Sequence, residues 1–297
     1  MRRPALGPAL CLLSAASFGA MAIFGKLAYD ESVGVLTLLA VRFALATCVL
    51  GPIAAVRVRR RRPALPRRAL IAAFALGAVG YAAQAGLFFA ALERMDASLL
   101  ALLLYTYPAL VTVAAIALGR ERADRRRLGA LALASIGLVL VLGGAARGGL
   151  DPAAVAMALG ASATYTAYIL VSDRTVTALD PFVLSALVAV GAAATFTVIS
   201  VAAGSLHLSL SASAWLWLAC IAVVSTALAV VCFFAGMARV GPSTAAILST
   251  FEPPVTVALA FAAFGERLAA AQLVGAALVL SAVVALNVRT GRRAVPA

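Results

Sequence analysis

Ten apolar runs, each close to the length of a membrane-spanning helix, follow one another along the chain with only short polar breaks between them. A bilayer core about 30 Å thick is crossed by roughly 20 apolar residues in a helix. The runs cover residues 5–25, 33–56, 69–92, 97–118, 128–142, 153–171, 182–203, 212–237, 243–264 and 268–288. This succession predicts a polytopic membrane protein with ten transmembrane helices.

The runs are apolar on every side and lack the two-residue alternation of a barrel strand, so an all-α fold is predicted. Hydrophobic residues make up 64% of the chain and charged residues 12%, which leaves no polar stretch for a soluble domain. An alternative for the first run is a signal peptide, because Arg2 and Arg3 precede it and small residues lie near Ala20. An uncleaved first helix is the simpler interpretation, since the next apolar run follows closely.

The net charge of +13 is concentrated in alternate loops. Arginines gather after the second, fourth and tenth runs: Arg57, Arg59, Arg60, Arg61, Arg62, Arg67, Arg68, Arg120, Arg122, Arg125, Arg126, Arg127, Arg289, Arg292 and Arg293. Cytoplasmic loops of membrane proteins carry such an excess. We therefore expect a multi-pass protein of the bacterial inner membrane with both termini in the cytoplasm. The arginine run 59–62 is interpreted as a topology signal that also attracts anionic lipid of the bilayer, and nucleic acid is not expected as a partner.

Shifting the sequence by 145 positions aligns its two halves without a gap. The informative matches are Phe88-Phe89 with Phe233-Phe234, Arg94 with Arg239, Ser98 with Ser243, Pro108 with Pro253, and Glu121-Arg122 with Glu266-Arg267. Residues 1–146 and 147–297 then form two repeats of five helices each, and the odd number inverts the second repeat in the membrane. Inverted repeats are typical of secondary transporters.

Prolines interrupt the fourth and ninth predicted helices at corresponding places, Pro108 in one half and Pro253 with Pro254 in the other. A helix-interior proline cannot donate to the carbonyl four residues earlier, so such breaks free backbone acceptors. Paired breaks in the two repeats point to a binding or gating site at the membrane midplane. The alternative is a tolerated kink that only shapes packing.

Glu252 precedes Pro253 and is the one acidic residue deep inside a predicted span. A carboxylate there costs about 2.5–3.5 kcal/mol on the insertion scale, so it should face protein or water. It is a proton carrier, a partner for a substrate ammonium, or half of a structural ion pair. Arg42 is its expected counter-charge, unless that side chain extends to the interface. Lys26, at the end of the first run, is either an interfacial anchor or a gate residue.

Aromatic and small polar residues inside the spans are candidates to line a substrate cavity, although each is also compatible with simple packing. With Glu252 and Arg42 they form the predicted site: Tyr81, Gln84, Tyr105, Tyr107, Tyr165, Tyr168, Phe233 and Thr250. Tyr105 and Thr250 rank highest, because each lies three residues before the proline of its half.

Catalytic and metal-binding functions are not expected. The one histidine, His207, lies in a predicted loop, and no HExxH, Walker or CxxC motif occurs. The cysteines Cys11, Cys48, Cys220 and Cys232 lie inside apolar runs without paired spacing, as small core residues do. We therefore predict no enzyme, no cofactor and no metal.

With these residues in view, the chain resembles the drug/metabolite transporter superfamily, and within it the ten-helix family with two EamA repeats. The segments similar to the family pattern are 18–26, the pair Arg42-Phe43, the pair Tyr107-Pro108 followed by 119–122, and the pair Glu252-Pro253 followed by 265–268. Phe18 replaces a family tryptophan, and Arg120 is inserted between Gly119 and Glu121. The four-helix multidrug relatives rely on a first-helix glutamate that this chain lacks, which argues against transferring their proton exchange.

The resemblance implies a central cavity that opens alternately to each side of the membrane. We accordingly expect a secondary transporter that exports small organic metabolites, amino acids first among them, acting as a monomer or homodimer. The alternatives are an exporter of multiple drugs or cationic compounds and a non-transporting helical membrane subunit. The last of these predicts no substrate-sized cavity between the halves.

Overall fold

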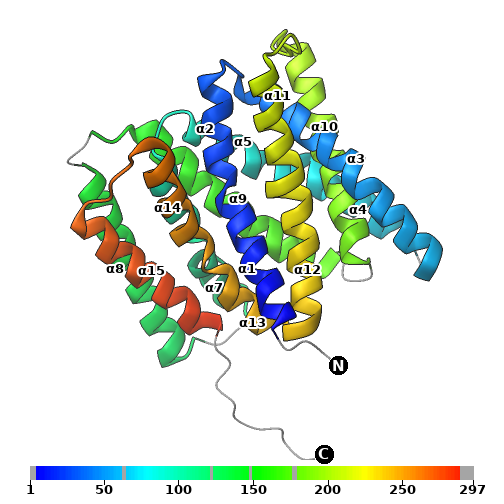
Figure 1. The fold of residues 1–297 in the computed structure, drawn as a ribbon. Coiled ribbons are helices and arrows are strands. Elements are labelled where there is room, and N and C mark those ends of the chain that lie inside the picture. The colour runs from blue at the N-terminus through cyan, green and yellow to red at the C-terminus, as the bar shows by residue number, and fades with distance from the viewer. Residues whose placement is uncertain (1–4, 62–64, 121–122, 147–148, 176–178, 288–297) are drawn as a thin grey trace, which may run out of the picture.

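The computed structural model describes residues 5–61, 65–120, 123–146, 149–175 and 179–287, and these form a helical bundle without strands (Figure 1). The first half contains α1 (Leu6–Gly19), α2 (Met21–Asp30), α3 (Val35–Arg61), α4 (Arg67–Ala75), the π-helical segment η1 (Leu76–Tyr81), α5 (Ala82–Leu92), α6 (Ala97–Leu104), α7 (Tyr107–Ala117) and α8 (Arg125–Ala146). The second half contains α9 (Pro152–Thr175), α10 (Pro181–Ala202), α11 (Ala212–Ala219), the π-helical segment η2 (Cys220–Leu228), α12 (Ala229–Val240), α13 (Pro242–Ser249), α14 (Glu252–Phe264) and α15 (Ala270–Asn287).

Within this described part of the chain, nine helical stretches are long and apolar enough to cross a membrane. A tenth, Ala270–Leu286, is apolar but shorter. The predicted all-α membrane fold is therefore confirmed. Part of the evidence for topology, including Glu121, Arg122 and the residues beyond Asn287, lies outside the described residues.

The first span is longer than the sequence pattern indicated. Its apolar run ends at residue 25, but the helix continues through Lys26 to Asp30. It stops where Ser32 takes a positive φ of 61° and donates to the Tyr29 carbonyl, while Val33 donates to Ala28. These two hydrogen bonds, from residues beyond the helix back to carbonyls of its last turn, are a common way to end a helix. Lys26 therefore lies inside a helical turn and not at the helix end.

Helices of the two halves pack in a reciprocal pattern. The first span of each half packs on the third span of the other, as α1 on α12 and α9 on α5. The second spans α3 and α10 pack together at one side of the bundle, and the fifth spans α8 and α15 at the other (Figure 1). Each pairing has a counterpart with the halves exchanged, as expected for two repeats related by an approximate two-fold axis.

Two glycines allow α8 and α15 to cross closely. A Cβ atom at Gly137 of α8 would lie 2.7 Å from the carbonyl oxygen of Gly275 in α15, and one at Gly275 would lie 2.5 Å from that of Gly137. Backbone atoms cannot yield as a flexible side chain can, so these positions need hydrogen as a side chain. Small residues of this kind let membrane helices pack through their backbones.

Irregular segments recur in the same register as the sequence repeat. When the sequence is shifted by 145 residues, the break after Leu104 aligns with the break after Ser249. In the same register, η1 aligns with the central part of η2. The pairs Phe88–Phe89 and Phe233–Phe234 make similar edge contacts, with centroids 5.3 and 5.4 Å apart. The repeat therefore extends to the departures from α-helical geometry.

Different helices begin and end at the two ends of the bundle. At one end, called here the terminal face, α1 begins and α15 ends (Figure 1). The basic end of α3 and the basic start of α8 belong to this face. At the other end, called here the opposite face, α2 ends and α6 begins.

Candidate functional site

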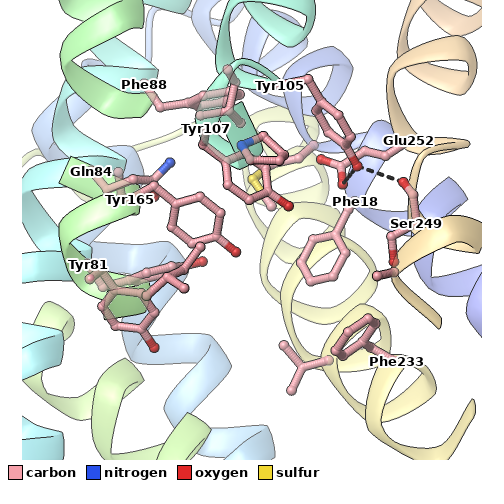
Figure 2. A pocket seen from close by; sticks show the side chains of 18 of the residues that line it. Phe18, Tyr81, Gln84, Phe88, Tyr105, Tyr107, Tyr165, Phe233, Ser249 and Glu252 are labelled. Atoms are coloured by element: carbon pink, nitrogen blue, oxygen red, sulfur yellow. Dashed lines mark hydrogen bonds between the residues drawn. The ribbon is translucent and has the colours of Figure 1, made fainter. Parts of the chain in front are cut away.

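A cavity of about 620 Å³ lies between the two halves of the bundle (Figure 2). All ten side chains that the sequence singled out as cavity candidates line it: Arg42, Tyr81, Gln84, Tyr105, Tyr107, Tyr165, Tyr168, Phe233, Thr250 and Glu252. Pro108 lines it as well, whereas Lys26, Pro253 and Pro254 are not among its lining residues. The structure thus brings the candidates together, and their role in binding stays a prediction.

The helix breaks supply polar backbone to one wall of this cavity. Pro253 has no N–H with which to bond the Ser249 carbonyl, so that oxygen is free for another donor. The Tyr105 hydroxyl takes this place at 2.6 Å. Tyr105 itself follows the last residue of α6 just as Thr250 follows the last residue of α13. Pro253 lies in the first turn of α14, after α13 has ended at Ser249, and the Ser249 carbonyl is bound by a side chain of the other half.

Glu252 begins α14 and lies half-buried in the cavity wall. Its Oε2 lies 3.0 Å from the Tyr105 hydroxyl (Figure 2). Neither Arg42 nor any other described cation forms an ion pair with it. The expected Arg42–Glu252 contact is therefore absent.

Arg42 is held elsewhere because α3 packs against η2 and not against α14. Its Nε donates to Thr226 Oγ1 at 3.1 Å, and its guanidinium lies over the rings of Phe43 and Phe89 at 4.7 and 5.2 Å. The residue is 2% exposed, so the side chain does not extend to the membrane interface. Arg42 is a buried cation at the cavity wall, separate from Glu252.

Aromatic rings form the wall that faces Glu252. Tyr81, Tyr168, Tyr165, Tyr107 and Tyr105 follow one another in ring contact, with successive centroids 5.7, 6.0, 4.7 and 5.8 Å apart. Figure 2 shows Tyr107 and Tyr165 between the Gln84 side and the Glu252 side of the cavity. Because several of these rings come from α7 and α9, the wall also joins the two halves.

The cavity extends towards the terminal face. Its lining includes Leu50 in the second half of α3, Ser185 near the start of α10, Arg127 near the start of α8 and Leu286 at the end of α15. The start of α8, the start of α10 and the end of α15 lie at the terminal face with the basic end of α3, where Arg57 pairs with Asp180. The conformation therefore gives the cavity access to that face.

A carboxylate cluster joins the halves at the opposite face. Glu266, between α14 and α15, accepts hydrogen bonds from the backbone N–H groups of Ala97 and Ser98, both at 3.0 Å, and from the Ser98 hydroxyl at 2.7 Å. Lys26 adds an ion pair at 2.9 Å and lies 3.8 Å from Asp96. The Glu266 side chain is only 7% exposed. This end of the bundle is held closed by contacts between the two halves.

The electrostatics of Glu266 follow from the same contacts. Burial alone would raise the pKa of this carboxyl group, but the hydrogen bonds from Ser98 and Lys26, together with the Lys26 charge, outweigh it. The net effect lowers the pKa of Glu266 below its ordinary value. Glu266 is therefore a charged acceptor at the start of α6, where the helix dipole also favours negative charge.

Comparison with known proteins identifies the architecture. The model of the EamA-like transporter family matches the chain twice, over residues 5–143 and 152–288. The chain belongs to this family. In all, 17 chains of solved structures match. One of them superposes on this EamA-like chain with a TM-score of 0.64 at 17% sequence identity. The match covers 94% of this chain and 95% of the other chain. That likeness shows the fold alone. No curated protein sequence matches.

Several residues at the site of this EamA-like transporter were missed in the sequence. Thr226 lines the cavity and holds Arg42, and it corresponds to Tyr81 when the chain is shifted by 145 residues, so the repeat register alone would have pointed to it. Phe18 and Met21 also line the cavity, at the break between α1 and α2. No proline marks that break, and the sequence gives no comparable signal for it.

Proposed function

We propose that this EamA-like protein is a secondary carrier that exports small organic metabolites, amino acids in particular, by alternating access through the central cavity. One observation carries the proposal. A cavity of about 620 Å³ lies between two repeats, lined by broken helices from both. Cavities of about 300–1,000 Å³ are typical of small-molecule sites.

The charges of the cavity suit a zwitterion. Glu252 and Arg42 line the same space but do not neutralise each other. A substrate that carries an ammonium and a carboxylate offers one partner to each of them. An uncharged metabolite would leave the buried guanidinium of Arg42 without a carboxylate and would offer Glu252 no ammonium group.

The tyrosine wall favours an apolar or aromatic side chain on that substrate. Rings stack on rings and attract cations, so the same wall also accommodates an organic cation held at Glu252. An exporter of cationic compounds is therefore the second candidate. A non-transporting membrane subunit, by contrast, predicts no substrate-sized cavity between the halves, and the 620 Å³ cavity argues against it.

The proposed transport cycle follows from the two ends of the bundle. In this conformation the cavity reaches the basic terminal face, which the positive-inside rule assigns to the cytoplasm. Export then requires that the contacts at Glu266 break and that the terminal face closes. In this proposal residues 1–146 and 147–297 are the two units that move relative to each other, in a bacterial inner membrane with both termini in the cytoplasm.

Counterflow in liposomes tests the substrate class. Purified protein is reconstituted with an internal pool of unlabelled amino acids, and the uptake of radiolabelled amino acids is measured against a parallel panel of labelled organic cations. Uptake of amino acids that depends on the internal pool supports the proposal. Uptake of cations without uptake of amino acids refutes amino acids as the substrate but retains a carrier. Silence in both panels refutes both candidate substrate classes.

A further inference from the structure

The Tyr105 hydroxyl has one hydrogen and lies between two oxygen acceptors. The Ser249 carbonyl, at 2.6 Å, can only accept a hydrogen bond, and an ionised carboxylate at Glu252 Oε2, 3.0 Å away, can also only accept. One O–H cannot serve both at full strength. The shorter contact, to the carbonyl, takes the hydrogen.

The second contact is satisfied if Glu252 carries a proton. An ionised Glu252 would set its lone pairs against those of the phenol oxygen, whereas a protonated carboxyl group donates to that oxygen and completes the chain from Glu252 through Tyr105 to Ser249. A buried polar network is favourable when every member has a partner and unfavourable when one does not. The geometry therefore fits the neutral form of Glu252.

The start of α14 lacks the backbone donors that would stabilise a charge there. Carboxylates at helix N-termini are normally stabilised by free N–H groups in the first turn. Here the two residues after Glu252 are Pro253 and Pro254, which have no N–H, and the next one, Val255, donates to the Phe251 carbonyl. Little of the usual helix-end stabilisation reaches the carboxylate.

Among the described residues, the elements around Glu252 place no cation in an ion pair with it. Its titratable neighbours are tyrosines, one each from the end of α6, α7 and α9: Tyr105, Tyr107 and Tyr165. Helix α1 presents the backbone of Gly19, and α13 presents Ser249. The cation on α2, Lys26, is paired with Glu266 at the opposite face.

We propose that Glu252 is a proton-binding site and that the carrier exchanges this proton for the cationic group of its substrate. The proposal rests on the proposed function, because it assumes that a substrate enters the cavity. When the ammonium group arrives, the carboxyl O–H bond breaks, the proton leaves to cavity water, and the carboxylate pairs with the ammonium. Tyr105 keeps its bond to Ser249 and joins α6 of the first half to the helix break of the second.

Infrared spectroscopy tests the proton site without any substrate. Spectra of the purified protein are recorded in detergent from acidic to alkaline pH, and the band of protonated carboxyl groups is followed in wild type and Glu252→Gln. Glu31→Gln is the matched control, because Glu31 caps the end of α2, does not line the cavity and accepts a hydrogen bond from Ser211. We expect a band at neutral pH that is lost in Glu252→Gln, retained in Glu31→Gln and shifted in Tyr105→Phe, which removes the phenol oxygen.

The absence of a Glu252-dependent band at neutral pH would overturn the proposal, whatever the protein transports. If Glu252→Gln does not fold, the wild-type spectrum and the Tyr105→Phe shift decide the question alone. Coupling is tested by calorimetric titration with L-phenylalanine in two buffers that differ in ionisation heat. A buffer-dependent heat corresponding to about one proton released per bound molecule supports exchange. Binding with no proton release would refute exchange and leave the carrier function intact.

Discussion

Removing the charge of Glu266 should weaken the closed end of the carrier. Four hydrogen bonds from the other half converge on this carboxylate, including two from the backbone at the start of α6. Hydrogen bonds to charged groups contribute about 1.5–3 kcal/mol each, and neighbouring bonds are not additive. Glu266→Gln keeps one acceptor oxygen but loses the charge opposite Lys26, so we expect a loss of about 2–3 kcal/mol, on the order of a 30- to 150-fold change in equilibrium.

The pH dependence distinguishes this reasoning from a general loss of packing. The folded pKa of Glu266 lies below its ordinary value, so the unfolded chain binds the proton more readily. The stabilisation is therefore fully present above the ordinary glutamate pKa of about 4.3 and is lost as the pH falls through the lower folded pKa. Thermal unfolding curves of wild type and Glu266→Gln should differ at pH 7 and converge in acid.

Thermal unfolding in detergent provides the assay, with Glu31→Gln as the control for a carboxylate at the end of α2 that forms no ion pair among the described residues. A loss of 2–3 kcal/mol corresponds to a fall of roughly 4–12 °C in melting temperature for a large domain. Equal melting temperatures for wild type and Glu266→Gln at pH 7 would refute the stabilising role of the cluster. A difference that persists unchanged at low pH would refute its ionic origin.

Two further substitutions test the packing and the buried cation. Gly137→Ala should destabilise the bundle by about 1–3 kcal/mol, because the new Cβ would lie 2.7 Å from the Gly275 carbonyl oxygen. The control is Gly129→Ala on the same helix: a Cβ there meets no atom within 4 Å, so the melting temperature should be nearly unchanged. Thr226→Val leaves the Nε of Arg42 without its acceptor and should cost about 1–3 kcal/mol, with Thr226→Ser restoring stability. Equal unfolding temperatures within either pair would contradict the corresponding contact.

Much of the fold was predictable because hydropathy is a local property of the sequence and the repeat register follows from aligning the sequence with itself. The apolar runs located the spans, and the register of Pro108 with Pro253 located the two breaks, since a missing N–H acts on the residue's own helix. The cysteine prediction succeeded only in part: Cys11 and Cys232 are buried, but Cys48 is exposed on the bundle surface. A short apolar run does not reveal which of its faces points to lipid.

The site was predictable as a set of residue types but not as a set of contacts. The candidate tyrosines and Glu252 do line one cavity, because polar groups inside spans avoid lipid. The predicted pairing of Arg42 with Glu252 was wrong. The partner of Arg42 depends on which helix faces α3, and packing between the two halves decides which helix that is. The hydrogen bonds that Ser98 donates to Glu266 join residues 168 positions apart, a separation that no sequence periodicity spans.

Blocking the cavity tests the central claim most directly. Ala246 lines the cavity, whereas Ala263 on α14 is exposed on the bundle surface, so Ala246→Trp and Ala263→Trp add the same side chain inside and outside the proposed pathway. Counterflow of labelled amino acid in liposomes is measured for both variants and wild type. The account predicts that Ala246→Trp abolishes exchange while Ala263→Trp retains it, and equal exchange by the two variants would contradict transport through this cavity.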